Sequence, residues 1–282
     1  MKEQEFIQRY LAGERDFYDF DLEGICLDGS NPDLLEVLPT VNSKEKDSTP
    51  RVILQNLNLG GANLEGVNLA YINLENVNLT GADLRGADLT YINLNNVNLT
   101  ESVFDCSNFH QTHCTNIDFT NIQLRDDSDW NKTSFVNCNF YQAQLQNISL
   151  SEVDFHNCNL ERANIVFYNL YETSFANSSL IQAHFTSNCL YEDEISKINF
   201  IGANLTDTVF HRINFAKIII DKNTQLEPQL LQIIKLFNRQ LTDDELIELD
   251  LSNVNLAYSD LSHLDLSYLN LSNANLQNTN LL

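Results

Sequence analysis

Proline is scarce in this sequence, and its few positions are uneven. Only four prolines occur among 282 residues, and none lies between residues 51 and 227. Proline has no backbone N–H and is excluded from the interior of a hydrogen-bonded β-ladder. The long proline-free stretch therefore allows continuous β-structure, and the four prolines indicate breaks in it: Pro32, Pro39, Pro50 and Pro228.

Basic residues and long apolar runs are also lacking. Lys and Arg number 16 against 39 Asp and Glu, which gives a net charge of −23. Nucleic acids and anionic membranes reward Lys and Arg, so we expect no direct nucleic-acid binding, and a basic protein partner suits this charge better. No apolar run is long enough to cross a bilayer, and the first residues have no apolar signal-peptide core. We therefore expect no membrane insertion and a cytoplasmic location.

Leucine, in contrast, recurs at every fifth residue. In "ANLEGVNLAYINLENVNLTGADL", residues 62–84, leucine occupies positions 64, 69, 74, 79 and 84. A helix places apolar residues with a period of 3.6 and a strand with a period of 2, so neither explains this spacing. The register holds over residues 54–124, resumes after one extra residue over 135–220, and returns over 246–281. Trp130 is the expected stand-in at the extra residue.

The residues around each fifth-position leucine follow a rule as well. Two residues earlier the side chain is small or β-branched, as in Ala62 and Val67, and the residue between is usually Asn or Asp, as in Asn63. This unit resembles the A-(D/N)-L-x-x unit of the pentapeptide-repeat family, and the resemblance covers about four-fifths of the chain. It implies a right-handed, four-sided β-helix in which each unit forms one side and each Leu or Phe points inward. We therefore predict an all-β solenoid, a right-handed quadrilateral β-helix of about eleven coils with an N-terminal capping helix and one inserted helix near the C-terminus.

We expect a single domain over residues 1–282, with boundaries where the rule of five fails. The segment 224–246 has apolar residues at helical spacing and predicts one helix of about twelve residues from Pro228, packed on the flank of the rod. The sequence offers no cap for the last coil, which predicts a homodimer through that end. The expected segments are a helix cap at 1–16, first repeat sides at 17–27, an excursion at 28–50, the main β-helix at 51–220, a helical insertion at 221–245 and the last two coils at 246–282.

Residues 20 positions apart should lie above one another, about 4.8 Å apart. Inside the rod this predicts a stack of Phe135, Phe155 and Phe175, continued by Ile195 and Phe215.

On the outside, the same alignment predicts an acidic ladder beside stacked tyrosines. Tyrosine gives a large contact area at low entropic cost, so we take these residues as a candidate interaction surface. The alternative is a solvated corner whose terminal cations relieve the repulsion between the glutamates. The ladder is Lys132, Glu152, Glu172, Glu192 and Arg212; Tyr171 and Tyr191 lie beside it, and Tyr71 and Tyr91 form a second pair.

Sequence motifs that carry chemistry are missing. The chain has no phosphate-binding glycine loop, no G-x-S-x-G, no H-E-x-x-H and no C-x-x-C, and its six scattered cysteines favour reduced thiols. His110 and His113 lie close to Cys114, but the repeat directs Cys114 inward and places the two histidines at a corner. We predict no catalytic residue, no cofactor and no metal site. A site for an enzyme would have to lie under residues 28–50 or beside the 224–246 helix.

Two functions fit these observations. The first is a non-enzymatic scaffold that presents flat β-helix faces to an unidentified protein partner. The alternative is a DNA-mimicking protein that binds DNA gyrase or another basic DNA-binding protein, as some pentapeptide-repeat proteins do. The repeat segments 51–220 and 246–282 carry a net charge of −14, whereas DNA of similar length carries roughly 25 to 30 charges. The charge density therefore disfavours the mimic.

Overall fold

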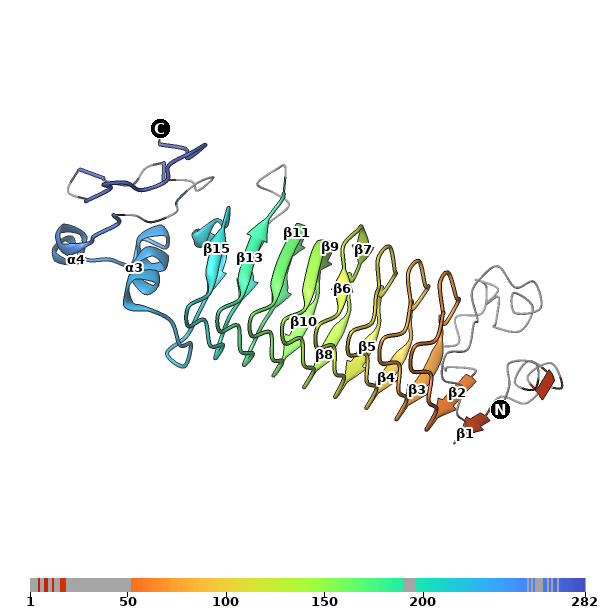
Figure 1. Ribbon diagram of the computed structural model, residues 1–282. Helices are drawn as coiled ribbons and strands as arrows, with labels where there is room; N and C mark the ends of the chain where they lie inside the picture. The colour runs from red at the N-terminus through yellow and green to blue at the C-terminus, as the bar shows by residue number, and fades with distance from the viewer. Residues whose placement is uncertain are drawn as a thin grey trace.

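The chain forms an elongated parallel β-solenoid of about eight turns (Figure 1). In the computed structural model, residues 52–189 and 196–252 are described without interruption. The other described residues are 5, 8, 9, 12 and 16–18 before this region, and 254, 256, 261, 262, 264, 266, 267 and 269–281 after it. The parallel solenoid confirms the fold predicted from the five-residue repeat.

One side of the solenoid is a ten-stranded sheet in which each strand pairs in parallel with the strand one coil later. Leu54 pairs with Leu74, and Leu74 with Leu94, so one coil takes 20 residues. In sheet order the strands are β1 (Asp16–Tyr18), β2 (Val52–Gln55), β3 (Ile72–Glu75), β4 (Asn93–Asn95), β5 (His113–Thr115), β8 (Ser134–Val136), β10 (Asp154–His156), β12 (Thr173–Ser174), β14 (Ile198–Asn199) and β16 (Ile218–Ile219).

A second side is a shorter parallel sheet over the later coils. Its strands are β15 (Val209–His211), β13 (His184–Ser187), β11 (Asn164–Tyr171), β9 (Gln144–Ser151) and β6 (Gln123–Leu124), and β7 (Ser128–Asp129) also pairs with β9. Elsewhere the coils are joined by single parallel bridges, such as the one between Asn58 and Asn78.

The fifth-residue register fills the axis, as predicted. Leu64 and Leu84 keep only 2% and 1% of their surface exposed, and Ala62 and Ala82 none. The small residue leaves room for the large one, because protein interiors are close-packed. Trp130 is fully buried with its ring 5.0 Å from that of Phe135, which confirms it as the stand-in.

The predicted phenylalanine stack forms, but its continuation differs. The rings of Phe135, Phe155 and Phe175 lie 5.0 and 4.9 Å apart. The next ring is Phe200, at 5.3 Å, because Thr173 pairs with Ile198, 25 residues later. Ile195 lies outside the described residues, and the continuation through Phe215 is wrong, since Asn199 pairs with Ile219. Five extra residues preserve a five-residue period, so the sequence pattern conceals this insertion.

The corners of the rod adopt a left-handed backbone at the second residue after the inward one. Gly61 and Gly81 have φ of 63° and 65°, and asparagine takes the same place at many corners. Both residue types tolerate this conformation. One corner carries an asparagine in every coil from Asn56 to Asn177, which forms an asparagine ladder. At several steps the side-chain amides of successive coils hydrogen-bond to each other. Asn116 Nδ2 donates to Asn96 Oδ1 at 3.1 Å, and Asn157 Nδ2 donates to Asn137 Oδ1 at 2.6 Å. The members of the ladder are Asn56, Asn76, Asn96, Asn116, Asn137, Asn157 and Asn177.

Two helices, not one, follow the main stack. A short 3-10 helix, η2 (Phe215–Lys217), precedes α3 (Pro228–Phe237) and α4 (Asp243–Glu248). Thr242 caps α4, since its hydroxyl accepts from the Glu245 N–H while the Glu245 carboxylate accepts from the Thr242 N–H. This capping box is a sequence signal for a second helix. Neither helix is long and apolar enough to span a membrane, and the same holds for every helix in the described residues.

Helix α3 lies at the end of the stack, not on its flank (Figure 1). The Phe237 ring lies 5.7 Å from that of Phe215 in the last coil, and Ile233 and Ile234 are buried. The end of the stack exposes the apolar rings of the last coil, so an amphipathic helix gains more buried area there than on the polar outer faces.

A short second stack follows α4. Leu251 and Leu256 donate backbone hydrogen bonds to Asn270 and Asn275, which restores the 20-residue spacing. It begins near Asp250, because the predicted start at residue 246 lies inside α4. The main solenoid has about eight turns. The prediction of about eleven coils counted the second stack and the first repeat sides as well, so the coil number differs only slightly.

Near the other end, the described residues are few. Glu5, Gln8 and Arg9 are helical, and β1 pairs with β2 in the register Phe17 to Leu54. The rest of the expected helix cap and the excursion at 28–50 lie outside the described residues.

Candidate interaction surface

The predicted surface residues that the structure describes share one edge of the rod. Backbone hydrogen bonds connect this edge from coil to coil, from the N–H of one corner residue to a carbonyl of the next coil. They join Tyr71 to Thr90 (3.1 Å), Tyr91 to His110 (3.1 Å), Gln111 to Asn131 (3.0 Å), Lys132 to Ser151 (2.8 Å) and Glu152 to Tyr171 (2.6 Å). We call Tyr71, Tyr91, Gln111, Lys132, Glu152 and Glu172 the corner column. The single-residue insertion before Trp130 is what aligns the early tyrosines with the later charges.

All members of the corner column are held in the left-handed region. Tyr71, Tyr91 and Glu152 have φ of 63°, 58° and 57°. Such a backbone costs roughly 1 kcal/mol for a side chain larger than glycine. The coil geometry imposes the conformation at this corner, and the side chains therefore project outward in fixed directions.

The acidic ladder does not form as predicted. Lys132 lies 3.8 Å from Glu152, and the register of β12 with β14 brings Lys197, not Glu192, opposite Glu172. Tyr191 and Glu192 lie outside the described residues. The five-residue insertion causes the difference, and the result is a column of mixed sign.

Aromatic side chains continue from the corner column onto the adjoining side. The rings of Tyr71 and Tyr91 are stacked at 4.7 Å with 20° between their planes. His110 meets Tyr91 edge-on at 6.4 Å, and its Nδ1 lies 3.8 Å from the carboxylate of Asp129. Tyr91 remains 40% exposed, so its ring is available to a partner.

A tyrosine that the sequence reasoning missed completes this surface. The pairing of β11 with β9 shifts register between Val166 and Asn169, which turns Phe167 fully inward and leaves Tyr168 39% exposed. Such a β-bulge re-aims a side chain. The signal in the sequence is that Tyr168 occupies a position where the repeat demands a small residue.

The phenol of Tyr168 lies in an acidic environment. Burial raises the pKa of Tyr168, and the nearby charges of Asp127 and Asp129 raise it further. Burial also raises the pKa of Tyr71, with Tyr91 and Asp88 contributing. Both phenols are therefore neutral hydrogen-bonding groups at physiological pH.

These residues gather on one side of the rod, which we call the tyrosine face. Of the five tyrosines with described side chains, four lie there, while Tyr141 lies on another side, bonded to Arg162 at 3.2 Å. The face comprises Tyr71, Tyr91, His110, Asp129, Tyr168 and Tyr171. It combines exposed aromatic rings with carboxylates, which suits contact with cationic side chains.

The cysteines and histidines do not assemble into a reactive centre among the described residues. No group of three or more metal-ligating side chains forms there. Cys114, Cys138 and Cys158 are buried free thiols. A hydrogen bond with Cys138 and burial raise the pKa of Cys158, so this thiol is protonated and unreactive.

Comparisons with known proteins agree with the fold. Eight copies of a family described as "Pentapeptide repeats" match the chain, at residues 58–90, 82–121, 133–166 and 245–281. No curated protein matches it significantly.

The chain is also similar to solved structures from several sources. HetL, a pentapeptide-repeat protein involved in heterocyst differentiation regulation in the cyanobacterium Nostoc sp. strain PCC 7120, is 18% identical; the match covers 99% of this chain and 94% of HetL, with a TM-score of 0.41. A trypsin-treated form of QnrB1, a plasmid-mediated fluoroquinolone resistance protein, is 13% identical over 78% of this chain and 95% of its own, with a TM-score of 0.36. A pentapeptide-repeat protein of the Arabidopsis thaliana thylakoid lumen is 20% identical; the match covers 49% of this chain and 67% of that protein, with a TM-score of 0.19.

Proposed function

Because this chain belongs to the pentapeptide-repeat family, we propose that it is a non-enzymatic scaffold that binds a basic protein through the tyrosine face. The single observation that carries the proposal is the concentration of four exposed or half-exposed tyrosines on one side of an otherwise polar rod.

The chemistry of the face favours a partner rich in Lys and Arg. A cation over the face of a tyrosine ring gains on the order of 0.5–1 kcal/mol at an exposed site. The carboxylates of Asp88, Asp127 and Asp129 add attraction, whereas Lys132 is already paired with Glu152. The rod is rigid, so binding requires little ordering of this side.

A pair of variants tests this proposal. Tyr91→Asn combined with Tyr168→Ala removes two rings, and asparagine suits the left-handed corner at residue 91. In affinity capture from the native cell, we expect the wild type to retain a basic protein that the double variant loses. Tyr141→Ala, on another side, is the matched control. Retention of every partner by the double variant would refute the role of the tyrosine face.

The second candidate function is DNA mimicry. The acidic net charge and the rod shape suggest it. The charge density of the repeats, which is about half that of DNA, and the mixed signs of the corner column weaken the resemblance to a line of phosphates. The deciding assay is inhibition of supercoiling by purified DNA gyrase. Inhibition at micromolar protein supports mimicry, and unchanged supercoiling excludes it.

We also propose that the last described coil pairs with a second copy of the chain. Leu251, Leu256 and Leu261 are at most 1% exposed, but Leu281 in the following coil is 51% exposed. A β-helix end that no described residue covers presents apolar residues and unpaired backbone. Light scattering should give about twice the chain mass of 32.2 kDa, and Leu276→Glu should restore the monomer. A wild-type monomer at high concentration would contradict this pairing.

The cytoplasmic location remains part of the proposal. Cys138 and Cys158 are free thiols on adjacent coils, a state that a reducing compartment maintains. Cell fractionation with a tagged chain tests it, and recovery in an oxidising compartment would contradict it.

A further inference from the structure

The end of the six-stranded sheet leaves one strand with a free edge. Among the described residues, β15 pairs with β13 and with no later strand. In earlier coils the inward residue of this side donates its N–H to the next coil, as Leu84 does to Val103 (2.8 Å) and Phe104 to Gln123 (2.9 Å). After β15 the chain passes through η2 and β16, and it enters α3 at Pro228 where the next strand of this side would follow. The edge of β15 therefore presents backbone groups arranged to pair with another strand.

Glu227 marks where the ladder stops. In earlier coils, the corner residue that precedes this side of the rod donates its backbone N–H to a backbone carbonyl of the next coil, as Gln182 does to Thr206 at 3.0 Å. Asp207 donates instead to the Glu227 carboxylate, at 2.7 Å. A side chain thus completes the corner, and the pairing ends immediately before β15.

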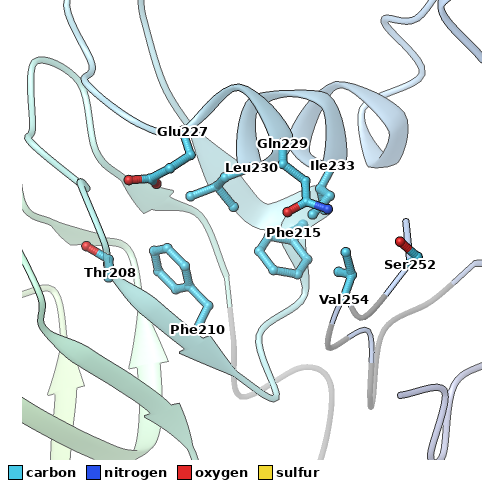
Figure 2. Close-up of a pocket in the computed structure, with 9 residues that line it drawn as sticks. All are labelled: Thr208, Phe210, Phe215, Glu227, Gln229, Leu230, Ile233, Ser252 and Val254. Atoms are coloured by element: carbon cyan, nitrogen blue, oxygen red, sulfur yellow. The ribbon is translucent and has the colours of Figure 1, made fainter. Parts of the chain in front are cut away.

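A pocket of about 540 Å³ lies beside this edge (Figure 2). Phe210 and Phe215 come from the last coil, Leu230 and Ile233 from α3, and Val254 from the second stack. Thr208 Oγ1 donates to the Leu180 carbonyl at 2.7 Å, and Gln229 Nε2 donates to the Asp250 carbonyl at 3.3 Å. Glu227 and Ser252 also line the pocket, so its wall is partly polar. The five apolar lining side chains provide a place for an apolar side chain beside these polar groups.

We propose that β15 and this pocket bind an extended peptide segment of a partner protein by parallel strand addition. Strand addition combines main-chain hydrogen bonds with pockets for alternate side chains. One apolar side chain of the peptide, which we call the anchor, would enter the pocket. By the pattern of the earlier coils, the Phe210 N–H would donate to the backbone carbonyl of the peptide residue before the anchor. The backbone N–H of that same peptide residue would donate to the Thr208 carbonyl. The anchor itself is a leucine- or phenylalanine-sized side chain, which takes the place of the missing inward residue over Phe210.

The charge around the site specifies the flanks of the peptide. The carboxylate of Glu227 lines the pocket, the whole chain carries a net charge of −23, and the ammonium of Lys235 already lies 3.4 Å from Glu245. A peptide with Lys or Arg beside its apolar anchor complements this surface. Nucleic acid carries the wrong charge. This site is separate from the tyrosine face and goes beyond the scaffold function.

Fluorescence polarisation with a synthetic peptide tests the proposal. The probe is a labelled peptide of about nine residues with a central leucine flanked by lysines, and full-length protein is titrated against it. We expect a Kd on the order of 10–100 μM, as for a short interface. Replacing the central leucine by alanine, or N-methylating the residue before it, should each weaken binding about tenfold, since the first empties the pocket and the second removes a main-chain hydrogen bond.

Protein variants locate the site. Leu230→Arg fills the pocket with a cation and should weaken binding about tenfold, whereas Ile201→Arg, which makes the same kind of change at a residue 40% exposed and outside the pocket, should leave it unchanged. Circular dichroism checks that both variants fold. Tyr91→Asn with Tyr168→Ala should retain the peptide, so failure of the tyrosine face and of this site can be told apart.

Three outcomes would overturn the proposal. They are the absence of peptide binding at millimolar protein, equal binding of the N-methylated peptide, and a change of mass in Leu230→Arg without peptide, which would assign the edge to a second copy of the chain.

Discussion

At the scale of single residues, the corners carry the conformational strain of the rod. Most second residues after an inward Leu or Phe have positive φ, and they include tyrosine, glutamate, lysine and arginine as well as glycine and asparagine. Non-glycine residues rarely adopt this conformation unless the surrounding structure enforces it. The hydrogen bonds between coils supply that constraint, so residue choice at corners adjusts stability without altering the fold.

Gly81 offers a direct measure of this strain. Its φ is 65°, and a Cβ added there would meet no atom within 4 Å. Gly81→Ala should therefore lower the free energy of unfolding by about 1 kcal/mol through backbone strain alone. Urea denaturation measures the change, and Gly81→Asn, which tolerates the conformation, should cost less. Equal stability of the alanine variant would show that the corner relaxes.

Asp221 makes stability depend on pH. Its pKa is lowered, first by the backbone hydrogen bond from Gly202 and then by bonds from Thr224 and Asn223. Because the folded pKa lies below the unfolded value, this contribution is present above about pH 4 and is lost as pH falls through the folded pKa. Asp221→Asn should be less stable at pH 7 and should lose less stability on acidification. Thermal unfolding between pH 7 and pH 3 tests this, and parallel curves would contradict it.

At the scale of elements, the stability of the rod comes from ladders that run along it. Phenylalanine rings stack inside, and amides bond to each other at the asparagine corner. Stacked identical side chains of this kind also stabilise cross-β assemblies. The elements that interrupt the ladders, which are the bulge at Tyr168, the edge of β15 and α3, are the ones that create the candidate surfaces.

Two variants of Asn137 separate the contribution of the amide hydrogen bonds to stability from that of the backbone conformation. Its amide donates to Asn116 at 3.2 Å and accepts from Asn157 at 2.6 Å, with φ of 54°. Asn137→Gly removes the bonds but keeps a residue that fits, and should cost about 1 kcal/mol. Asn137→Ala should cost about 1 kcal/mol more because it adds strain. Urea denaturation compares the two variants, and equal costs would show that only the hydrogen bonds matter.

At the scale of the whole molecule, charge is unbalanced and only weakly compensated. The described ion pairs of Lys and Arg are few and partly or fully surface-exposed: Arg85 with Glu65 and Asp83, Lys132 with Glu152, and Lys235 with Glu245. Exposed pairs contribute little, whereas a net charge of −23 repels itself in the compact state. Repulsion of this kind disfavours the folded rod at low ionic strength.

Added salt should therefore stabilise the protein. Screening shortens the range of repulsion to about 10 Å at 0.1 M salt, and we expect Tm to rise by roughly 2–5 °C between low salt and 0.3 M sodium chloride. Calorimetry or circular dichroism measures Tm, with potassium chloride as a control for ion-specific effects. A fall in Tm would mean that the ion pairs outweigh the net repulsion.

Much of the fold was predictable from the sequence, because a five-residue period requires a backbone that turns once per unit. The inward leucines, the phenylalanine stack and Trp130 follow from counting along the chain. The candidate surface was less predictable. Tyr71 and Tyr91 were found, but counting by 20 placed Glu192 opposite Glu172, where the structure places Lys197.

The sequence by itself determined the solenoid, its inward register and its acidic character, since each depends on local periodicity or composition. The tertiary structure alone decided which outward residues meet, because that depends on how many residues each coil contains. A five-residue insertion leaves the period unchanged but displaces every later neighbour by one side. Likewise, only the packed structure shows that Tyr168 is turned outward by a bulge and that β15 ends a sheet beside a pocket.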